Sequence, residues 1–143
     1  MAVKILFTAH AKATGGRTGH AQSSDGLVSV DLSVPKAMGG PGKPNTTTPE
    51  DLFAAGYAAC FGGAVDFVAT KKQVKATDIT VDAAVGFGTT DEGNFQLKVD
   101  LTVSMKGVSQ AEAHALVEAA HQVCPYSRAT RNNIEVSLKA VAL

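Results

Sequence analysis

Apolar and polar residues alternate along the first quarter of the chain, as they do in β-strands with one face buried. Between residues 3 and 13 apolar side chains fall mostly at every second position, which predicts a strand over 3–13. Glycines at positions 15, 16 and 19 then predict a turn, and a second alternation covers residues 27–34. The N-terminal region is therefore predicted to form an antiparallel meander.

A helix is predicted over residues 49–71, after a breaker-rich loop at 35–45. Thr48 can cap its first turn, proline follows at the first helical position, and two acidic residues face the positive end of the helix dipole. The body of the helix is apolar nearly all round, which indicates burial on several sides. Its longest uncharged stretch, 52–65, is shorter than the ~18–20 residues that span a bilayer. We therefore interpret this segment as a central buried helix and expect no membrane association.

The second half of the chain alternates again over residues 79–87 and 95–105, with a turn-rich segment between them. This pattern predicts a hairpin of two long strands. Ser109 and Glu112 have the spacing of a capping box, and the apolar stripe that follows continues to Pro125. A second helix is predicted between these signals.

A last alternation over residues 134–140 predicts a closing strand. The helices are few and segregated from the strands, which indicates an α+β fold with a mostly antiparallel sheet of about six strands and two main helices. A length of 143 residues fits a single domain spanning 1–143.

Composition and charge narrow the functional class. The chain is 45% hydrophobic and 18% charged, which excludes a disordered protein. Thirteen basic residues balance thirteen acidic ones, so the electrostatic signature of a nucleic-acid-binding protein is missing. No glycine-rich nucleotide motif occurs, and the N-terminus lacks the pattern of a signal peptide, so we expect a cytoplasmic protein without a nucleotide cofactor.

The two cysteines are the main candidates for chemistry, because reducing compartments rarely keep structural disulfides. Cys60 lies in the middle of the predicted central helix, where the dipole no longer lowers a thiol pKa, so a reactive Cys60 needs a cation from elsewhere. Cys124 precedes Pro125 at a helix end. The histidines show no ligand spacing with the cysteines, and no metal site is expected.

Three separated motifs, in the right order, closely resemble those of the organic hydroperoxide resistance (Ohr) family within the OsmC/Ohr superfamily. These are ATGGRTG at residues 13–19, PEDLFAAGYAACFGGA at 49–64 and VCPYSRATRNNI at 123–134. The resemblance covers the whole chain and implies the OsmC/Ohr fold, built as an intertwined homodimer.

The activity that the resemblance implies is a thiol-dependent peroxidase that reduces alkyl and lipid hydroperoxides. Cys60 would be the peroxidatic cysteine, Cys124 the resolving cysteine, Arg17 the activating arginine and Glu50 its carboxylate partner. Cys60 sulfenic acid would condense with Cys124 to an intramolecular disulfide. The external reductant would be dihydrolipoamide carried by a lipoylated protein, with no cofactor bound to the chain itself.

Helix geometry adds a constraint to this assignment. Ten residues of straight helix would separate Glu50 from Cys60 by roughly 15 Å, which one arginine does not bridge easily. Either the helix is broken before Cys60, or Arg17 and Glu50 reach Cys60 partly from a second copy of the chain. A two-fold dimer with interfacial sites satisfies the second alternative.

Apolar side chains near the central helix and its leading loop are candidates for a substrate pocket. They are Met38, Phe53, Tyr57, Phe61 and Phe67. The alternative is that these residues belong to the core, since aromatics on a buried helix need no ligand.

Two other functions remain open. One is a peroxidase of the OsmC branch with a broader range of peroxides. The other is a redox-inert protein that uses the apolar pocket to bind a small lipophilic ligand. The reactivity of the two thiols distinguishes a peroxidase from an inert binding protein.

Overall fold

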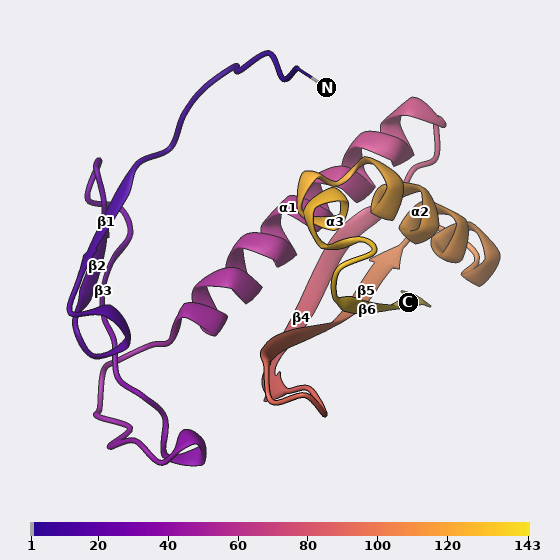
Figure 1. Ribbon diagram of the computed structural model, residues 1–143. Helices are drawn as coiled ribbons and strands as arrows, with labels where there is room; N and C mark the ends of the chain where they lie inside the picture. The colour runs from indigo at the N-terminus through magenta and orange to yellow at the C-terminus, as the bar shows by residue number, and fades with distance from the viewer. Residues whose placement is uncertain (1) are drawn as a thin grey trace. The chain divides into compact units, whose positions relative to one another are not determined.

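The computed structural model describes residues 2–143, which form two compact units, one up to Leu52 and one from Phe53 onward. The boundary falls inside the long helix α1, Pro49–Lys71 (Figure 1). The expectation of one domain over 1–143 stays a prediction.

The N-terminal unit contains a small antiparallel sheet in the order β1-β2-β3, which confirms the predicted meander. Its elements are β1 (Ala11–Thr14), the short 3-10 helix η1 (Gly16–Thr18), β2 (His20–Ser23), β3 (Ser29–Asp31) and a second 3-10 helix, η2 (Lys36–Met38). Leu32 adds a single parallel bridge to Thr47. This unit ends in the first residues of α1.

The first predicted strand is wrong in its extent. Residues 3–10 form no strand, and β1 begins only at Ala11. The side chains of Ile5, Leu6 and Phe7 are 66%, 87% and 83% exposed. Alternation shows which side chains share a face, but a strand also needs a neighbour for its backbone hydrogen bonds. For the same reason the strand predicted over 27–34 shortens to Ser29–Asp31.

The C-terminal unit is built on a three-stranded sheet in the order β4-β5-β6. The strands are β4 (Thr77–Thr89), β5 (Phe95–Lys106) and β6 (Glu135–Ala142). β4 and β5 form the predicted antiparallel hairpin, whereas β6 runs parallel to β5. The crossover between β5 and β6 contains α2 (Gln110–Val123) and α3 (Pro125–Thr130), because parallel neighbours cannot be joined by a tight turn. The six strands and the two main helices confirm the α+β fold.

The core of this unit lies between the sheet and its helices (Figure 1). Alternate residues of β5 are buried, from Val99 to Met105, and they pack with apolar side chains of α1 and α2. By length and composition α1 could also cross a membrane, a property that core helices of water-soluble proteins share. Its buried residues, Tyr57, Phe61, Val65 and Val68 among them, make it a core helix here.

The helix ends follow from local chemistry. Thr48 Oγ1 accepts a hydrogen bond of 3.1 Å from the backbone N–H of Asp51, as predicted for the start of α1. The capping box of Ser109 and Glu112 opens α2. Pro125 ends α2 but also occupies the first position of α3, a helix that the sequence reading did not predict.

Candidate active site

The two cysteines meet in the C-terminal unit. Cys60 lies part-buried on α1, and Cys124 lies fully buried at the residue that joins α2 to α3. Their Sγ atoms are 3.4 Å apart, and both are free thiols. A disulfide needs an S–S distance of about 2.05 Å, so a small side-chain movement suffices to form the bond.

The surroundings of Cys60 within this unit disfavour its thiolate. Burial raises the pKa of Cys60 above the ordinary value, a backbone hydrogen bond from Tyr126 opposes this change, and Cys124 adds to it. Desolvation is the largest of these effects, because an anion loses more than a neutral thiol when water is removed. A reactive Cys60 therefore needs a cation brought to its sulfur.

Behind the cysteines lies a buried polar cluster that the sequence reading did not identify. Tyr57, Ser127 and Thr130 are 0%, 0% and 5% exposed. Tyr57 Oη lies 2.8 Å from Ser127 Oγ and 3.2 Å from Thr130 Oγ1, and Ser127 Oγ lies 2.8 Å from Nδ1 of His121. Single serine and threonine residues form no periodic pattern in the sequence, so this cluster can be identified only from the structure.

In the N-terminal unit, Arg17 and Glu50 form a bidentate ion pair, as the resemblance implies. Arg17 Nη1 and Nη2 donate to the two carboxylate oxygens of Glu50 at 2.9 and 2.6 Å. This hydrogen bonding lowers the pKa of Glu50. Arg17 lies in η1, in the turn between β1 and β2. This turn is so tight that it requires glycine at position 19, where a Cβ would lie only 1.7 Å from the carbonyl oxygen of Thr14. Glu50 lies in the first turn of α1.

The structure decides one of the two geometric alternatives. Helix α1 is continuous from Pro49 to Lys71, so no break before Cys60 shortens its axial separation from Glu50. The alternative with a broken helix is therefore wrong. The contribution of a second copy stays a prediction.

A hollow of about 360 Å³ adjoins Cys60. Its other lining residues are Gly63, Ala64, Phe67, Val123 and Pro125. The wall is apolar, which suits an alkyl chain beside the sulfur.

Only one of the predicted pocket residues lines this hollow, namely Phe67. Tyr57 and Phe61 are fully buried core residues, which does not support their assignment to a substrate pocket. Phe53 packs against the rings of Tyr57 and Tyr126. Met38, at the end of η2 in the N-terminal unit, is 40% exposed, and its role stays a prediction.

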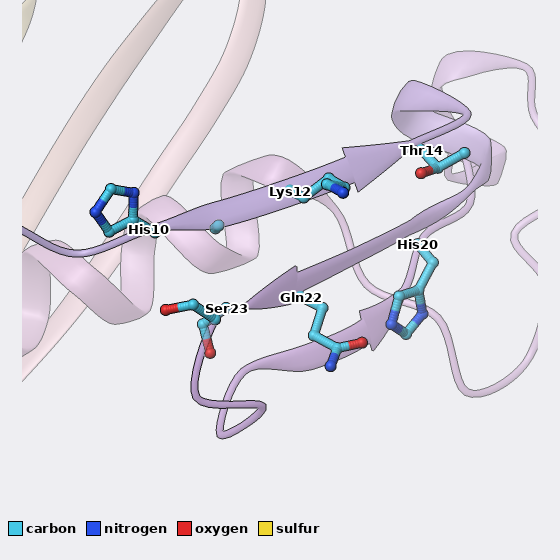
Figure 2. A pocket seen from close by; sticks show the side chains of 8 residues that line it. His10, Lys12, Thr14, His20, Gln22 and Ser23 are labelled. Atoms are coloured by element: carbon cyan, nitrogen blue, oxygen red, sulfur yellow. The ribbon is translucent and has the colours of Figure 1, made fainter.

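A larger hollow of about 620 Å³ lies on the N-terminal sheet (Figure 2). Most residues that line it have polar side chains, among them His10, Lys12 and His20. The ring nitrogens of His20 lie 2.8 Å from Asp31 Oδ1 and 3.1 Å from Ser29 Oγ. It contains no cysteine, and residues 2–143 hold no cluster of three or more histidine, cysteine or acidic side chains suited to a metal. Both cysteines lie in the C-terminal unit, not in the unit that contains this hollow.

Comparison with known proteins decides the family. Residues 40–139 match the family described as OsmC-like protein. The chain is 50% identical to an organic hydroperoxide resistance protein of Xanthomonas axonopodis pv. citri, over 94% of each chain. It is 44% identical to OhrB of Bacillus subtilis, over 94% of this chain and 97% of that one.

The chain belongs to the OsmC family. Solved structures also support its placement in the Ohr branch of this family. A crystal structure of an organic hydroperoxide resistance protein from Elizabethkingia anophelis is 45% identical, with a TM-score of 0.92 over 99% of this chain and 100% of that chain. One from Legionella pneumophila is 46% identical, with a TM-score of 0.90 over 98% and 100%. The Ohr fold is thus shared along nearly the whole chain.

Proposed function

We propose that this protein is a cysteine-based peroxidase that reduces organic hydroperoxides to alcohols. The Ohr relatives support a redox role in organic hydroperoxide resistance. The observation that carries the chemical proposal is the 3.4 Å separation of the Cys60 and Cys124 sulfurs. A part-buried thiol beside a fully buried one suits a peroxidatic and a resolving cysteine, respectively.

The reaction proceeds in two sulfur steps. The Cys60 thiolate attacks the terminal oxygen of the hydroperoxide, so an S–O bond forms, the O–O bond breaks, and the alkoxide takes a proton to leave as the alcohol. Cys60 is then a sulfenic acid. Cys124 attacks its sulfur, an S–S bond forms, the S–O bond breaks, and the hydroxyl leaves as water after taking the Cys124 proton.

Arg17 is the proposed source of the missing cation. A guanidinium beside Cys60 favours the thiolate and then the leaving alkoxide, which offsets the effect of burial. Glu50 holds that guanidinium in a planar, two-point contact. Because α1 is unbroken, we assign this pair to a second copy of the chain, which makes the protein a homodimer with two interfacial sites.

The exposed face of α1 fits such a dimer. Ala55, Ala59, Gly63 and Phe67 are exposed at four-residue intervals, so they share one apolar face. Small side chains allow two helix axes to approach closely. If two α1 helices cross antiparallel near Ala55, Glu50 of one copy lies level with Cys60 of the other, because each is five residues from the crossing.

The substrate class follows from the hollow beside Cys60. Phe67, Val123 and Pro125 give it an apolar wall, which binds an alkyl or lipid hydroperoxide better than hydrogen peroxide. Phe53 and Met38 stay candidates for extending this wall.

The catalytic cycle closes with an external dithiol. We propose dihydrolipoamide on a lipoylated protein, which reduces the Cys60–Cys124 disulfide by two electrons and is itself oxidised to the cyclic disulfide. No bound cofactor or metal is needed for these steps. A cytoplasmic location, with its reducing environment, is part of the same proposal.

The test is consumption of tert-butyl hydroperoxide with dihydrolipoamide by the wild type, Cys60→Ser and Cys124→Ser. Turnover should be lost in Cys60→Ser, whereas Cys124→Ser should consume about one equivalent and stop, because the sulfenic acid forms but is not resolved. Equal rates on hydrogen peroxide would favour the broader OsmC-type activity. Unreactive thiols in the wild type would favour a redox-inert binder of a lipophilic ligand and would contradict the proposal.

A further inference from the structure

The residue joining α2 to α3 places the resolving thiol, so its position depends on how α3 is held. Cys124 is the C-terminal cap of α2 and the N-terminal cap of α3. Its backbone N–H donates to the carbonyl of Ala120 at 2.9 Å, and its carbonyl accepts from the N–H of Arg128 at 3.0 Å. A shift of either helix therefore moves the Cys124 sulfur.

Helix α3 cannot hold this position alone. It spans only Pro125–Thr130, and helices of such length are not stable without tertiary contacts. The side chains that face inward from it are Ser127 and Thr130, which are polar and buried. Their partners must therefore supply the geometry through hydrogen bonds rather than through apolar packing alone.

The partners of Ser127 lie one helical turn from each cysteine. Ser127 follows Cys124 by three residues, His121 precedes Cys124 by three, and Tyr57 precedes Cys60 by three. Residues three apart on a helix share a face, so Tyr57 fixes the turn of α1 that carries Cys60. The bonds of 2.8 Å from Ser127 Oγ to Tyr57 Oη and to His121 Nδ1 thus join the segments that carry the two sulfurs.

The hydrogen-bonding capacities are consistent with one connected cluster. Thr130 Oγ1 lies 3.0 Å from the carbonyl oxygen of Tyr126 and 3.2 Å from Tyr57 Oη, and its single hydroxyl proton can be donated to Tyr57 Oη. A neutral His121 ring accepts from the Ser127 hydroxyl, whose oxygen can then accept from the Tyr57 hydroxyl. Gly56 leaves room for the Tyr126 side chain, since a Cβ there would make a tight contact of 3.2 Å with Tyr126 Oη.

We propose that Ser127, bonded to Tyr57 and His121, is a positioning residue that keeps the Cys124 thiol within reach of Cys60. The inference rests on the proposed role of Cys124 as the resolving thiol. A purely structural cluster affects the stability of the fold, whereas a positioning cluster also sets the effective concentration of one thiol at the other.

The equilibrium of the disulfide measures that effective concentration without any peroxide. Protein samples are equilibrated with reduced and oxidised dithiothreitol, trapped by alkylation and analysed by mass spectrometry. In this exchange the S–S bond of the oxidised reagent breaks, the Cys60–Cys124 bond forms, and two electrons and two protons pass to the reagent.

The variants are Ser127→Ala, Tyr57→Phe, the double variant and Val103→Ala. We expect each single variant to lower the equilibrium constant for the disulfide about tenfold, or about 30 mV in potential. The Ser127–Tyr57 bond is lost in both single variants, so the effect of the double variant should be smaller than the sum of the two single effects. Val103→Ala truncates a fully buried core residue of β5 and should match the wild type.

Three outcomes separate the claims. Single variants that equilibrate like the wild type overturn the inference and leave the proposed peroxidase untouched. An equal shift in Val103→Ala also overturns it, because the effect then reflects general loss of stability. A wild type that forms no Cys60–Cys124 disulfide overturns the proposed resolving role and the inference with it. Tyr57→Phe keeps the buried ring and decides the matter if Ser127→Ala fails to fold.

Discussion

The two units of the chain differ in how they are stabilised and in which of the proposed site residues they contain. From Phe53 onward a continuous apolar core surrounds a pair of thiols. Up to Leu52, within the part that the structure describes, the only buried residues are Leu32 and Ser33. That unit instead contains an ion pair between Arg17 of η1 and Glu50 of α1, and several of its apolar side chains are exposed.

The difference teaches that a reactive thiol and its activating charge have opposite environmental needs. A buried core protects the sulfurs from random oxidation, but it also raises the pKa of Cys60. A charged pair is less costly near the surface, where water solvates it. In the proposed homodimer, separate units would supply the thiols and the charged pair, which would satisfy both needs.

Truncating the core should give the largest change in stability. Leu101→Ala removes a side chain that is 1% exposed, so we expect a loss of about 2–5 kcal/mol in the free energy of unfolding. Leu27→Ala in the N-terminal unit removes one that is 87% exposed and should change stability by less than about 0.5 kcal/mol. Urea denaturation measures both. Equal losses would contradict the contrast between the units.

The second largest effect is expected from removing the guanidinium of Arg17. Arg17→Ala should slow the reaction of Cys60 with an organic hydroperoxide about 100-fold in a single turnover, as for the loss of one charge-stabilising donor. Arg128→Ala removes the same charge from an exposed position of α3 and serves as the control. Rapid-quench measurement of peroxide loss compares them. Similar rates in Arg17→Ala and the wild type would remove Arg17 from the mechanism.

The smallest of the three effects is expected from acid. Lowering the pH should destabilise the two units in different pH ranges. Burial and Arg131 lower the pKa of His121, against an opposing effect of Glu118. The unfolded chain then binds more protons, so stability falls as the pH drops below about 6.5. The ion pair with Arg17 lowers the pKa of Glu50. Its contribution to stability is therefore lost in a separate range, as the pH falls below the ordinary pKa of glutamate.

Denaturation curves of the wild type and His121→Gln across this range provide the measurement. The variant should lose the component of the pH dependence that lies just below 6.5 and keep the one at lower pH. A wild type and variant with the same profile would show that His121 does not titrate differently in the folded and unfolded states.

Local signals predicted those elements that local chemistry determines. The cap at Thr48 and Pro49 predicts the start of α1, and the apolar pattern that follows predicts its extent. The capping box predicts the start of α2. Residues 3–10 show the opposite case, because their alternation is real but no neighbouring strand pairs with them in one chain. Pro125 predicts the end of α2, but proline also favours the first position of a new helix, which is its place in α3.

The candidate site also contains residues that the sequence predicts and residues that only the structure identifies. Cys60 and Cys124 are candidates from the cysteine count alone, Arg17 and Glu50 only from the resemblance, and the structure places the four residues as two pairs. Their catalytic roles stay predictions. The hollow residues Val123 and Pro125 had no signal of their own, because apolar residues at a helix junction are typical of any core. Long-range packing alone identifies them.

The pKa of Cys60 tests the central claim most directly. It is measured by the pH dependence of alkylation in Cys124→Ser protein, so that one thiol reports, with and without Arg17→Ala. The account predicts a pKa well below the ordinary value of about 8.5 with Arg17 present and a return to or above that value without it. A thiol that titrates at or above the ordinary value in both proteins would contradict it.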